Sequence, residues 1–341
     1  MNLTIDIKTL KPVGFDIPKV ATSLNLSDTW GAIKVRWGIG RDRYLVNPGL
    51  YKVGIPTADS DVFVSANYKL SFDALRKNLN TINAWILVID TKGVNVWCAA
   101  GKGTFATTNL VNSIKDSSLD FIVKHKRIIV PQLGATGVAA HKIKEQTGFR
   151  VIFGPVQASD IPAFVKAGYK ATPQMRKIDF PFYERLKLIP VDFMYGKNRL
   201  SVALMVLFIL SGLDKTGFLF SKMIETSFFP LMNAGSAYLA GIVLTPLFLP
   251  WIPFRAFALK GAFWGFVVSL ILYLLYPVSI TEGLGLGLIN ISIAAFTAMN
   301  FTGSSTYTSL SGVKKEMKIA IPFQIAFAAA GLILFIVSKL I

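Results

Sequence analysis

The chain has 341 residues, 52% of them hydrophobic, and carries a formal net charge of +17. Residues 1–199 hold 28 of the 36 Lys and Arg and 15 of the 19 Asp and Glu, so the remainder is nearly free of charge. Because no aromatic–basic recognition motif accompanies the positive charge, we predict that it faces anionic membrane lipid and that the chain binds no nucleic acid.

Short apolar runs alternate with helical patterns in the first half of the chain. The predicted strands are Asp61–Ser65, Ala84–Asp90, Arg127–Pro131 and Arg150–Pro155, and the predicted helices are Ser71–Asn78 with Ser71 as its cap, one ending near Thr147, and one from about Ser159 to Gly168. This alternation is typical of a Rossmann-like α/β domain with a parallel sheet. Ligands of such sheets bind beyond the carboxyl ends of the strands, so the loop after Asp90 is the first candidate site.

The segment after Asp90 is not a nucleotide-binding loop. In a dinucleotide fingerprint Gly101 and Gly103 would be followed by a third glycine, but Ala106 stands there. A P-loop would need a glycine at Val96 and a Ser or Thr at Gly103. The sequence therefore gives little support for either kind of nucleotide-binding loop.

The same segment contains Cys98, the only cysteine of the chain. A lone cysteine usually serves as a small apolar core residue, but near the amino end of a helix the dipole favours the thiolate, which is the metal-ligating form. One cysteine cannot hold an iron–sulfur cluster or a structural zinc, and His125 and His141 lie in no metal-ligand spacing. A single thiolate suits a metal that a macrocycle already holds and that needs one axial ligand.

Four long segments of the second half contain no Asp, Glu, Lys or Arg: Thr226–Phe254, Gly261–Thr281, Gly283–Val313 and Ile319–Ser338. Each can cross a bilayer, which takes about 20 residues of helix. A shorter apolar segment, Leu200–Leu213, is a fifth candidate. We therefore predict an all-α bundle of five transmembrane helices at about residues 200–213, 232–250, 261–281, 283–302 and 319–338. Gly283, Gly285 and Gly287 are expected to allow close helix packing, and Asn233, Asn290 and Asn300 to form interhelical hydrogen bonds.

The Lys and Arg residues that flank these spans predict the orientation. Nine lie on the side of the first half of the chain and three on the other side. No secretory signal precedes the first half, because the amino terminus lacks an apolar segment. We therefore expect a multi-pass protein of the cytoplasmic (inner) membrane with the α/β domain in the cytoplasm and Ile341 outside.

The motif Asn95-Val96-Trp97-Cys98-Ala99-Ala100-Gly101-Lys102 resembles the cap-helix motif of the mercury-methylating corrinoid proteins, the HgcA family. The segments Val64–Arg76 and Trp85–Gly93 are also similar to that family, and so is the order of a corrinoid domain and a five-span membrane domain. The family is in turn related to the large subunit of the corrinoid iron–sulfur protein. The resemblance covers essentially the whole chain and implies a corrinoid-binding domain at residues 1–190 and a transmembrane domain at residues 191–341.

The resemblance implies that Cys98 is the lower axial ligand of cobalt in a corrinoid, either cobalamin or a related cobamide. It also implies cofactor contacts from the whole motif, namely Asn95, Val96, Trp97, Cys98, Ala99, Ala100, Gly101 and Lys102, and from Ser65, where the family often has Thr. Asn95 is expected to cap the helix. The chain lacks the Asp-x-His-x-x-Gly signature of histidine-ligated corrinoid proteins, which agrees with ligation by sulfur.

The activity implied by the resemblance is corrinoid-dependent methyl transfer to Hg(II), which makes the protein a methyltransferase that produces methylmercury. The implied partners are a methyltetrahydrofolate-linked methyltransferase that supplies the methyl group and a ferredoxin-like protein with two [4Fe–4S] clusters that supplies electrons. Two alternatives stay open: a membrane-anchored corrinoid methyl carrier with an acceptor other than mercury, and a transporter with a nucleotide-sensing domain.

Overall fold

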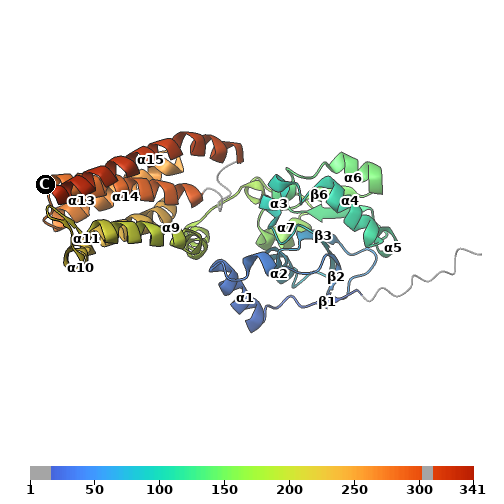
Figure 1. Ribbon diagram of the computed structural model, residues 1–341. Helices are drawn as coiled ribbons and strands as arrows, with labels where there is room; N and C mark the ends of the chain where they lie inside the picture. Colours follow the sequence, from blue (N-terminus) through green and yellow to red (C-terminus); the bar gives the residue numbers. More distant parts are fainter. Residues whose placement is uncertain (1–16, 302–309) are drawn as a thin grey trace, which may run out of the picture. The chain divides into compact units, whose positions relative to one another are not determined.

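The structure is a computed structural model that describes residues 17–301 and 310–341 (Figure 1). It contains two compact units. One consists of the described residues up to Ile33 together with Gly40–Lys177, and the other of Lys34–Ile39 together with Ile178–Ile341. The predicted domain boundary at residue 190 lies downstream of this division. Residues 1–16, where no secretory signal is predicted, and residue 302, the predicted end of the fourth span, lie outside the described residues.

The first unit is a mixed α/β domain. Its strands are β1 (Lys19–Val20), β2 (Gly49–Val53), β3 (Val62–Ala66), β4 (Ala84–Ile89), β5 (Arg127–Val130) and β6 (Arg150–Phe153). Its helices are α1 (Leu26–Arg36), α2 (Lys69–Lys77), α3 (Val96–Lys102), α4 (Thr107–Asp116), α5 (Leu119–Ile122), α6 (Ala140–Thr147) and α7 (Ile161–Lys166), with short 3-10 turns η2 (Arg41–Arg43), η3 (Gln132–Gly134), η4 (Ala158–Asp160) and η5 (Gln174–Arg176).

The six strands form one sheet in the order β1-β2-β4-β3-β5-β6. Strands β4, β3, β5 and β6 are mutually parallel, as the strand–helix alternation predicts, whereas β2 pairs antiparallel with β4. The fully parallel sheet expected from the sequence is thus a mostly parallel one. Strands β1 and β2 were not predicted, because Gly49–Val53 is short, begins with Gly after Pro48 and lacks a strong apolar run.

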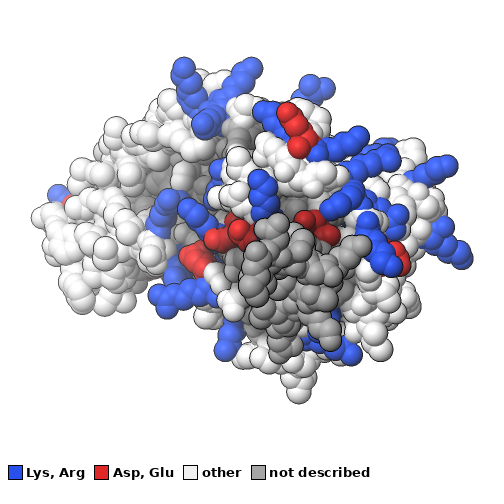
Figure 2. Space-filling view, turned by 90° about the vertical axis from the view of Figure 1, so that its right-hand side faces the viewer, with Lys and Arg blue, Asp and Glu red and all other residues white. Residues whose placement is uncertain are grey.

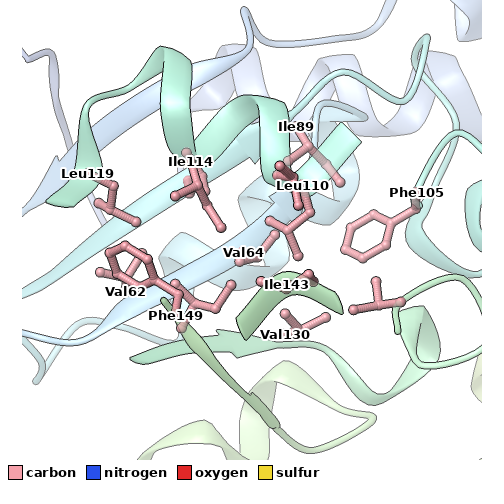
Figure 3. Packing of buried hydrophobic residues seen from close by; sticks show 14 of the residues in the cluster. Val62, Val64, Ile89, Phe105, Leu110, Ile114, Leu119, Val130, Ile143 and Phe149 are labelled. Carbon is pink, nitrogen blue, oxygen red and sulfur yellow. The ribbon is translucent and has the colours of Figure 1, made fainter. Parts of the chain in front are cut away.

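Helices cover both faces of the sheet, which explains why every residue of β3 and β4 is buried. On one face Val62, Val64 and Ile89 pack against α3, α4, α5 and α6 (Figure 3). On the other face Phe63, Ile86 and Val88 pack against α2 and α7. The alternation of side chains along each strand therefore assigns every strand residue to one of two separate cores.

One predicted helix start is wrong. Helix α2 begins at Lys69 after Tyr68, and Ser71, the predicted cap, lies within its first turn. Tyr68 is already positioned as the residue before the helix because it pairs with Leu45 across an isolated bridge. Tertiary pairing therefore places the cap position at Tyr68, three residues before the predicted cap.

The second unit is helical. It contains α8 (Phe182–Leu186), α9 (Ile189–Leu210), α10 (Phe220–Thr226), α11 (Phe228–Leu239), a π-helical turn (Ala240–Leu244), α12 (Thr245–Leu247), α13 (Phe257–Leu275), α14 (Ile280–Asn300) and α15 (Leu310–Leu340), with a small hairpin of β7 (Leu213–Asp214) and β8 (Gly217–Phe218). Five helical segments are long and apolar enough to cross a membrane: Phe182–Leu210, Phe228–Leu247, Phe257–Leu275, Ile280–Asn300 and Ser311–Leu340.

The first of these segments differs from its prediction. Helix α9 begins at Ile189, next to Pro190, rather than near Leu200, and ends at Leu210 rather than Leu213. The predicted span begins after Arg199 because an uncharged segment cannot include that residue. A helix continues through polar residues such as Lys197 and Asn198 as long as its backbone hydrogen bonds persist, and α9 does so.

Close contacts join the membrane-type helices. A Cβ at Gly285 of α14 would lie 2.9 Å from the carbonyl oxygen of Gly331 in α15, so these two helices meet backbone to backbone. Gly283 and Gly287 lie against Tyr273 and Ser269 of α13. Close packing at these glycines, predicted from the sequence, is confirmed.

Two of the three asparagines in this unit form an interhelical hydrogen bond. The side-chain amide of Asn290 in α14 donates to Oδ1 of Asn233 in α11 over 2.8 Å, and both residues are buried. The interhelical bonding expected of these two residues is therefore present. Asn300 lines a cavity of about 180 Å³ with Arg199 and Tyr238.

Lys and Arg side chains predominate over Asp and Glu on the face of the molecule shown in Figure 2. This agrees with the net charge of +17.

Candidate functional site

The carboxyl ends of β3, β4 and β5 meet at one edge of the sheet. Strand β3 lies between β4 and β5, which follow it in sequence on opposite sides, so the chain reverses its strand order there. In open α/β sheets such a reversal opens a crevice between the loops that leave the strands. The loops after Ala66, Ile89 and Val130 therefore border the predicted site.

A buried side chain, that of Asn67, organises this edge. It follows β3 directly, and its Oδ1 accepts hydrogen bonds from the backbone N–H of Thr91 (3.1 Å), the hydroxyl of Thr91 (2.9 Å) and the backbone N–H of Gly93 (3.0 Å). Its Nδ2 donates to Oδ1 of Asp90 over 3.0 Å. The side-chain amide of Asn67 thus holds the whole turn that follows β4.

That turn reverses the chain just ahead of α3. Lys92 and Gly93 have φ values of 56° and 70°, in the left-handed region. Asp90 accepts from the backbone N–H of Lys92 (2.9 Å), and the Thr91 hydroxyl shares its one proton between Oδ1 of Asn67 and the carbonyl of Val94 (2.7 Å). The residues between β4 and the motif are therefore fixed by hydrogen bonds.

Asn95 begins α3 as predicted. Its backbone is extended, and its side-chain oxygen accepts from the N–H of Cys98 over 2.9 Å. This bond satisfies one of the free N–H groups at the start of the helix. The predicted cap is confirmed, and it places the backbone of Cys98 directly.

The residues of the motif lie on two different sides of helix α3. Val96, Ala99 and Ala100 are buried in the core that α3 shares with the sheet. Trp97 and Cys98 are half-buried, and Gly101 and Lys102 are exposed. The alanines thus support the helix on the sheet side, while Trp97, Cys98, Gly101 and Lys102 remain accessible to a ligand.

The loop after β5 also packs against the buried side of α3. A Cβ at Gly137 would lie 3.2 Å from the Cα of Ala100 and would clash with the carbonyl oxygen of Phe105. The hydroxyl of Thr107 accepts from the N–H of Ala139 over 2.8 Å. Helix α3 is therefore held on its buried side by both the sheet and this loop, and Gly137 is needed for the close approach.

Ser65 lies apart from this arrangement. It shares with Phe63 the face of β3 that packs on α2 and α7, whereas the alanines of α3 share the other face with Val64. The Ser65 hydroxyl donates to the carbonyl oxygen of Ala66 over 3.0 Å. Its predicted influence on the thiol stays a prediction.

The chemistry of the site centres on a single thiol. Among residues 17–301 and 310–341 no group of three His, Cys, Asp or Glu side chains could hold a metal ion. His125 bonds to the carbonyl of Ser60, and His141 is exposed on α6. A metal ion at Cys98 would therefore need its other ligands from outside the described part of the chain.

Comparison with known proteins shows that this domain is similar to subunits of CO dehydrogenase/acetyl-CoA synthase and of corrinoid/iron-sulfur proteins. Residues 40–165 match the family model CdhD, the CO dehydrogenase/acetyl-CoA synthase delta subunit. The match runs from just before η2 to α7 and includes Asn67, Asn95 and Cys98. It ends before α8 and the five membrane-type helices.

Individual relatives agree with this match. The large subunit of the corrinoid/iron-sulfur protein of Moorella thermoacetica is 34% identical over 124 residues, which are 36% of this chain and 27% of that protein. The gamma subunits of the acetyl-CoA decarbonylase/synthase complexes of Methanopyrus kandleri and Archaeoglobus fulgidus are 29% and 27% identical over 37% and 36% of this chain and over 27% and 26% of their own lengths. The chain thus spans about a quarter of the curated relatives that it matches.

Sequence reasoning identified the helix of the site but missed much of its support. Asn67 lies within the segment Val64–Arg76 that resembles the HgcA family, and the sequence alone assigns no role to Thr91 or Gly137. An Asn or Thr directly after a buried strand is a signal for such residues, because a polar group there lies at the ligand-binding edge of a parallel sheet. That signal becomes specific only when the neighbouring strand is known.

Proposed function

We propose that the α/β domain binds a corrinoid with Cys98 as the lower axial ligand of cobalt, and that the protein transfers a methyl group from this cofactor to Hg(II). The observation that carries the proposal is the half-buried Cys98 on a capped helix, at the ligand-binding edge of a domain homologous to a corrinoid/iron-sulfur protein large subunit. The similarity of the motif to the HgcA family supports mercury as the acceptor.

The residues present fit a corrinoid. The donor set is one thiol, and a corrin macrocycle supplies the four equatorial ligands that the described part of the chain does not offer. The buried face of α3 carries only Val96, Ala99 and Ala100, so the helix lies close to the sheet while Cys98 and Gly101 remain on its accessible side. A helix with a glycine on its accessible side can lie close to a flat ring.

The chain's own contribution is positioning. A bound corrinoid supplies the cobalt that carries the methyl group, and the reaction chemistry belongs to it. Asn67 fixes the turn after β4, Asn95 fixes the backbone of Cys98, and the half-buried thiol can release its proton to solvent when it becomes a ligand. We further propose that residues 1–190 are cytoplasmic, that a ferredoxin-like protein supplies electrons, and that a methyltetrahydrofolate-linked methyltransferase supplies the methyl group.

A second candidate function is a membrane-anchored methyl carrier whose acceptor is not mercury. It is favoured by the similarity of the domain to subunits of acetyl-CoA decarbonylase/synthase complexes. Both functions require the corrinoid, so they differ only in the acceptor. Methyl transfer from the loaded protein to Hg(II) distinguishes them.

The test uses the full-length protein purified without oxygen, its Cys98→Ala and Cys98→His variants, and a control, Thr108→Ala, at an exposed position of α4. We expect all four to bind corrinoid, because most contacts with the ring do not involve sulfur. Cys98→Ala should show a cobalt spectrum shifted toward water ligation and should lose methylmercury formation per mole of cobalt. Cys98→His should regain an axial ligand without regaining the activity.

Three results would contradict parts of this proposal. A protein that stays free of cobalt after reconstitution with cobalamin would exclude the corrinoid. Unchanged methylmercury formation per cobalt in Cys98→Ala would exclude a role for the thiol. A normal cobalt spectrum without transfer to Hg(II) would favour the carrier.

A further inference from the structure

Exposed apolar side chains of the α/β region gather on one helix and the segments next to it. Between residues 17 and 177, nine large hydrophobic residues are exposed, and seven of them lie within residues 24–45: Leu24, Leu26, Trp30, Ile33, Trp37, Ile39 and Leu45. Single exposed apolar residues are common on soluble proteins, but a continuous group of them marks an interaction surface. The helix within this group is α1.

The apolar residues of α1 and Trp37, which directly follows the helix, form a stripe. Leu26, Trp30, Ile33 and Trp37 follow one another at spacings of four, three and four residues, which puts them on one side of a helix. Their side chains are 89%, 59%, 42% and 45% exposed. This stripe faces away from the domain that carries the helix.

The opposite side of α1 is firmly attached to the domain. Asp28 lies roughly 180° around the helix from the stripe at 3.6 residues per turn. Its carboxylate oxygens lie 2.6 Å from Nζ of Lys69 and 2.7 Å from the guanidinium of Arg76, both on α2. Asn25 and Asp28 also exchange hydrogen bonds in a capping box (2.8 and 3.0 Å). The direction of the apolar stripe is therefore fixed.

Positive charge follows the stripe. Residues 34–43 read Lys-Val-Arg-Trp-Gly-Ile-Gly-Arg-Asp-Arg, with four basic residues and one acidic residue, and with Trp37 and Ile39 exposed among them. Tryptophan, aliphatic and basic side chains in this combination are typical of helices that lie in the interface of an anionic membrane. Such residues also tend to occur where lipid headgroups meet the acyl region.

The last residues of α1 and the turn after it are grouped with the helical unit. Residues 34–39 belong to the helical unit, and within it a Cβ at Gly38 would lie 3.7 Å from the Cβ of Met194. Met194 belongs to the first segment capable of crossing a membrane, at a position before its apolar stretch from Leu200. This is the part of a span at which headgroups are expected.

We propose that α1 is an interfacial membrane helix that inserts Leu26, Trp30, Ile33 and Trp37 into an anionic lipid surface. A protein subunit and a second copy of the chain are the competing occupants of this surface. Lipid is favoured because the stripe is followed by basic residues and because Gly38, next to Trp37, lies close to Met194 of a membrane-type helix. The proposal does not depend on the reaction or on the cofactor.

The test measures the depth of single labels in the full-length protein reconstituted in vesicles of neutral lipid or of mixed neutral and anionic lipid. In a Cys98→Ser background, Leu26→Cys carries a polarity-sensitive fluorophore. The matched controls are Phe121→Cys, an exposed apolar position on α5 (81% exposed), and Ser27→Cys on the polar side of α1. Lipids spin-labelled in the upper acyl chain are the quenchers, because interfacial helices lie roughly 5–10 Å deep.

We expect the label at residue 26 to emit at shorter wavelength and to be quenched by the lipid several times more strongly than the labels at residues 27 and 121. The difference should be larger with anionic lipid and should decrease with salt. Equal quenching at the three positions would overturn the proposal. Protection of residue 26 from iodide without quenching by lipid would also overturn it, and would assign the surface to a protein.

Discussion

Removal of the Asn67 side chain should loosen the turn that leads to Cys98. In Asn67→Ala the buried N–H of Thr91 and the N–H of Gly93 lose their acceptor, while the hydroxyl of Thr91 can still donate to Val94. Each unsatisfied buried donor costs about 1–3 kcal/mol, and Gly93 is only half-buried and can reach water. We therefore expect a loss of about 2–4 kcal/mol in the local stability of the turn.

Hydrogen exchange of the full-length protein measures this loss. With tenfold for each ~1.4 kcal/mol, the amides of Thr91 and Gly93 should exchange about 30-fold faster or more, as long as they exchange by local opening. Thr91→Val removes only a hydroxyl and should have a smaller effect. Asn78→Ala, which deletes an exposed hydrogen bond to Ala74, is the control and should leave this turn unchanged. Equal exchange in the Asn67 and Thr91 variants would refute the assignment of the backbone bonds to Asn67.

Two further predictions concern a cap and a charge cluster. Asn95→Ala should destabilise α3 by about 1 kcal/mol, and Asn95→Ser should restore most of this, as seen in hydrogen exchange over Val96–Lys102. Burial raises the pKa of Asp28, but hydrogen bonds from Lys69 and Arg76 outweigh it and hold the pKa well below its usual value. The folded-state pKa is thus lower than the unfolded one, so the stabilisation is present above about pH 4 and is lost as the pH falls toward the folded pKa. The wild type should therefore lose stability as the pH falls, which acid unfolding monitored by tryptophan fluorescence can measure. Asp28→Asn should be less stable than the wild type at neutral pH, and its stability should depend less on acid. Equal acid sensitivity of the two proteins would show that Asp28 is not involved.

The sequence predicts elements well where burial alone determines them. The run of apolar residues from Ala84 to Ile89 is buried on both faces, so its composition is sufficient to indicate a central strand. The cap at Asn95 could also be predicted, because a cap is a local interaction over three residues. The five membrane-type helices follow from length and composition in the same way.

Features that depend on distant contacts could not be predicted. Ser71 has the chemistry of a cap, but the bridge between Tyr68 and Leu45 fixes the helix start earlier. Asn67 acts on residues 23 to 26 positions away, and only the pairing of β3 with β4 brings them together. The role of Gly137 likewise depends on where Ala100 lies after folding.

The small side chains on the buried side of α3 allow the helix that carries Cys98 to lie close to the sheet. Ala99 is completely buried, Ala100 is 7% exposed, and a Cβ at residue 137 would clash with the carbonyl oxygen of Phe105 and lie close to the Cα of Ala100. We expect a larger side chain at either alanine to shift the helix that carries Cys98, because the core around them is packed. Two methyl groups thus act as a spacer between α3 and the sheet, and side chains turned away from Cys98 are expected to influence where its thiol lies.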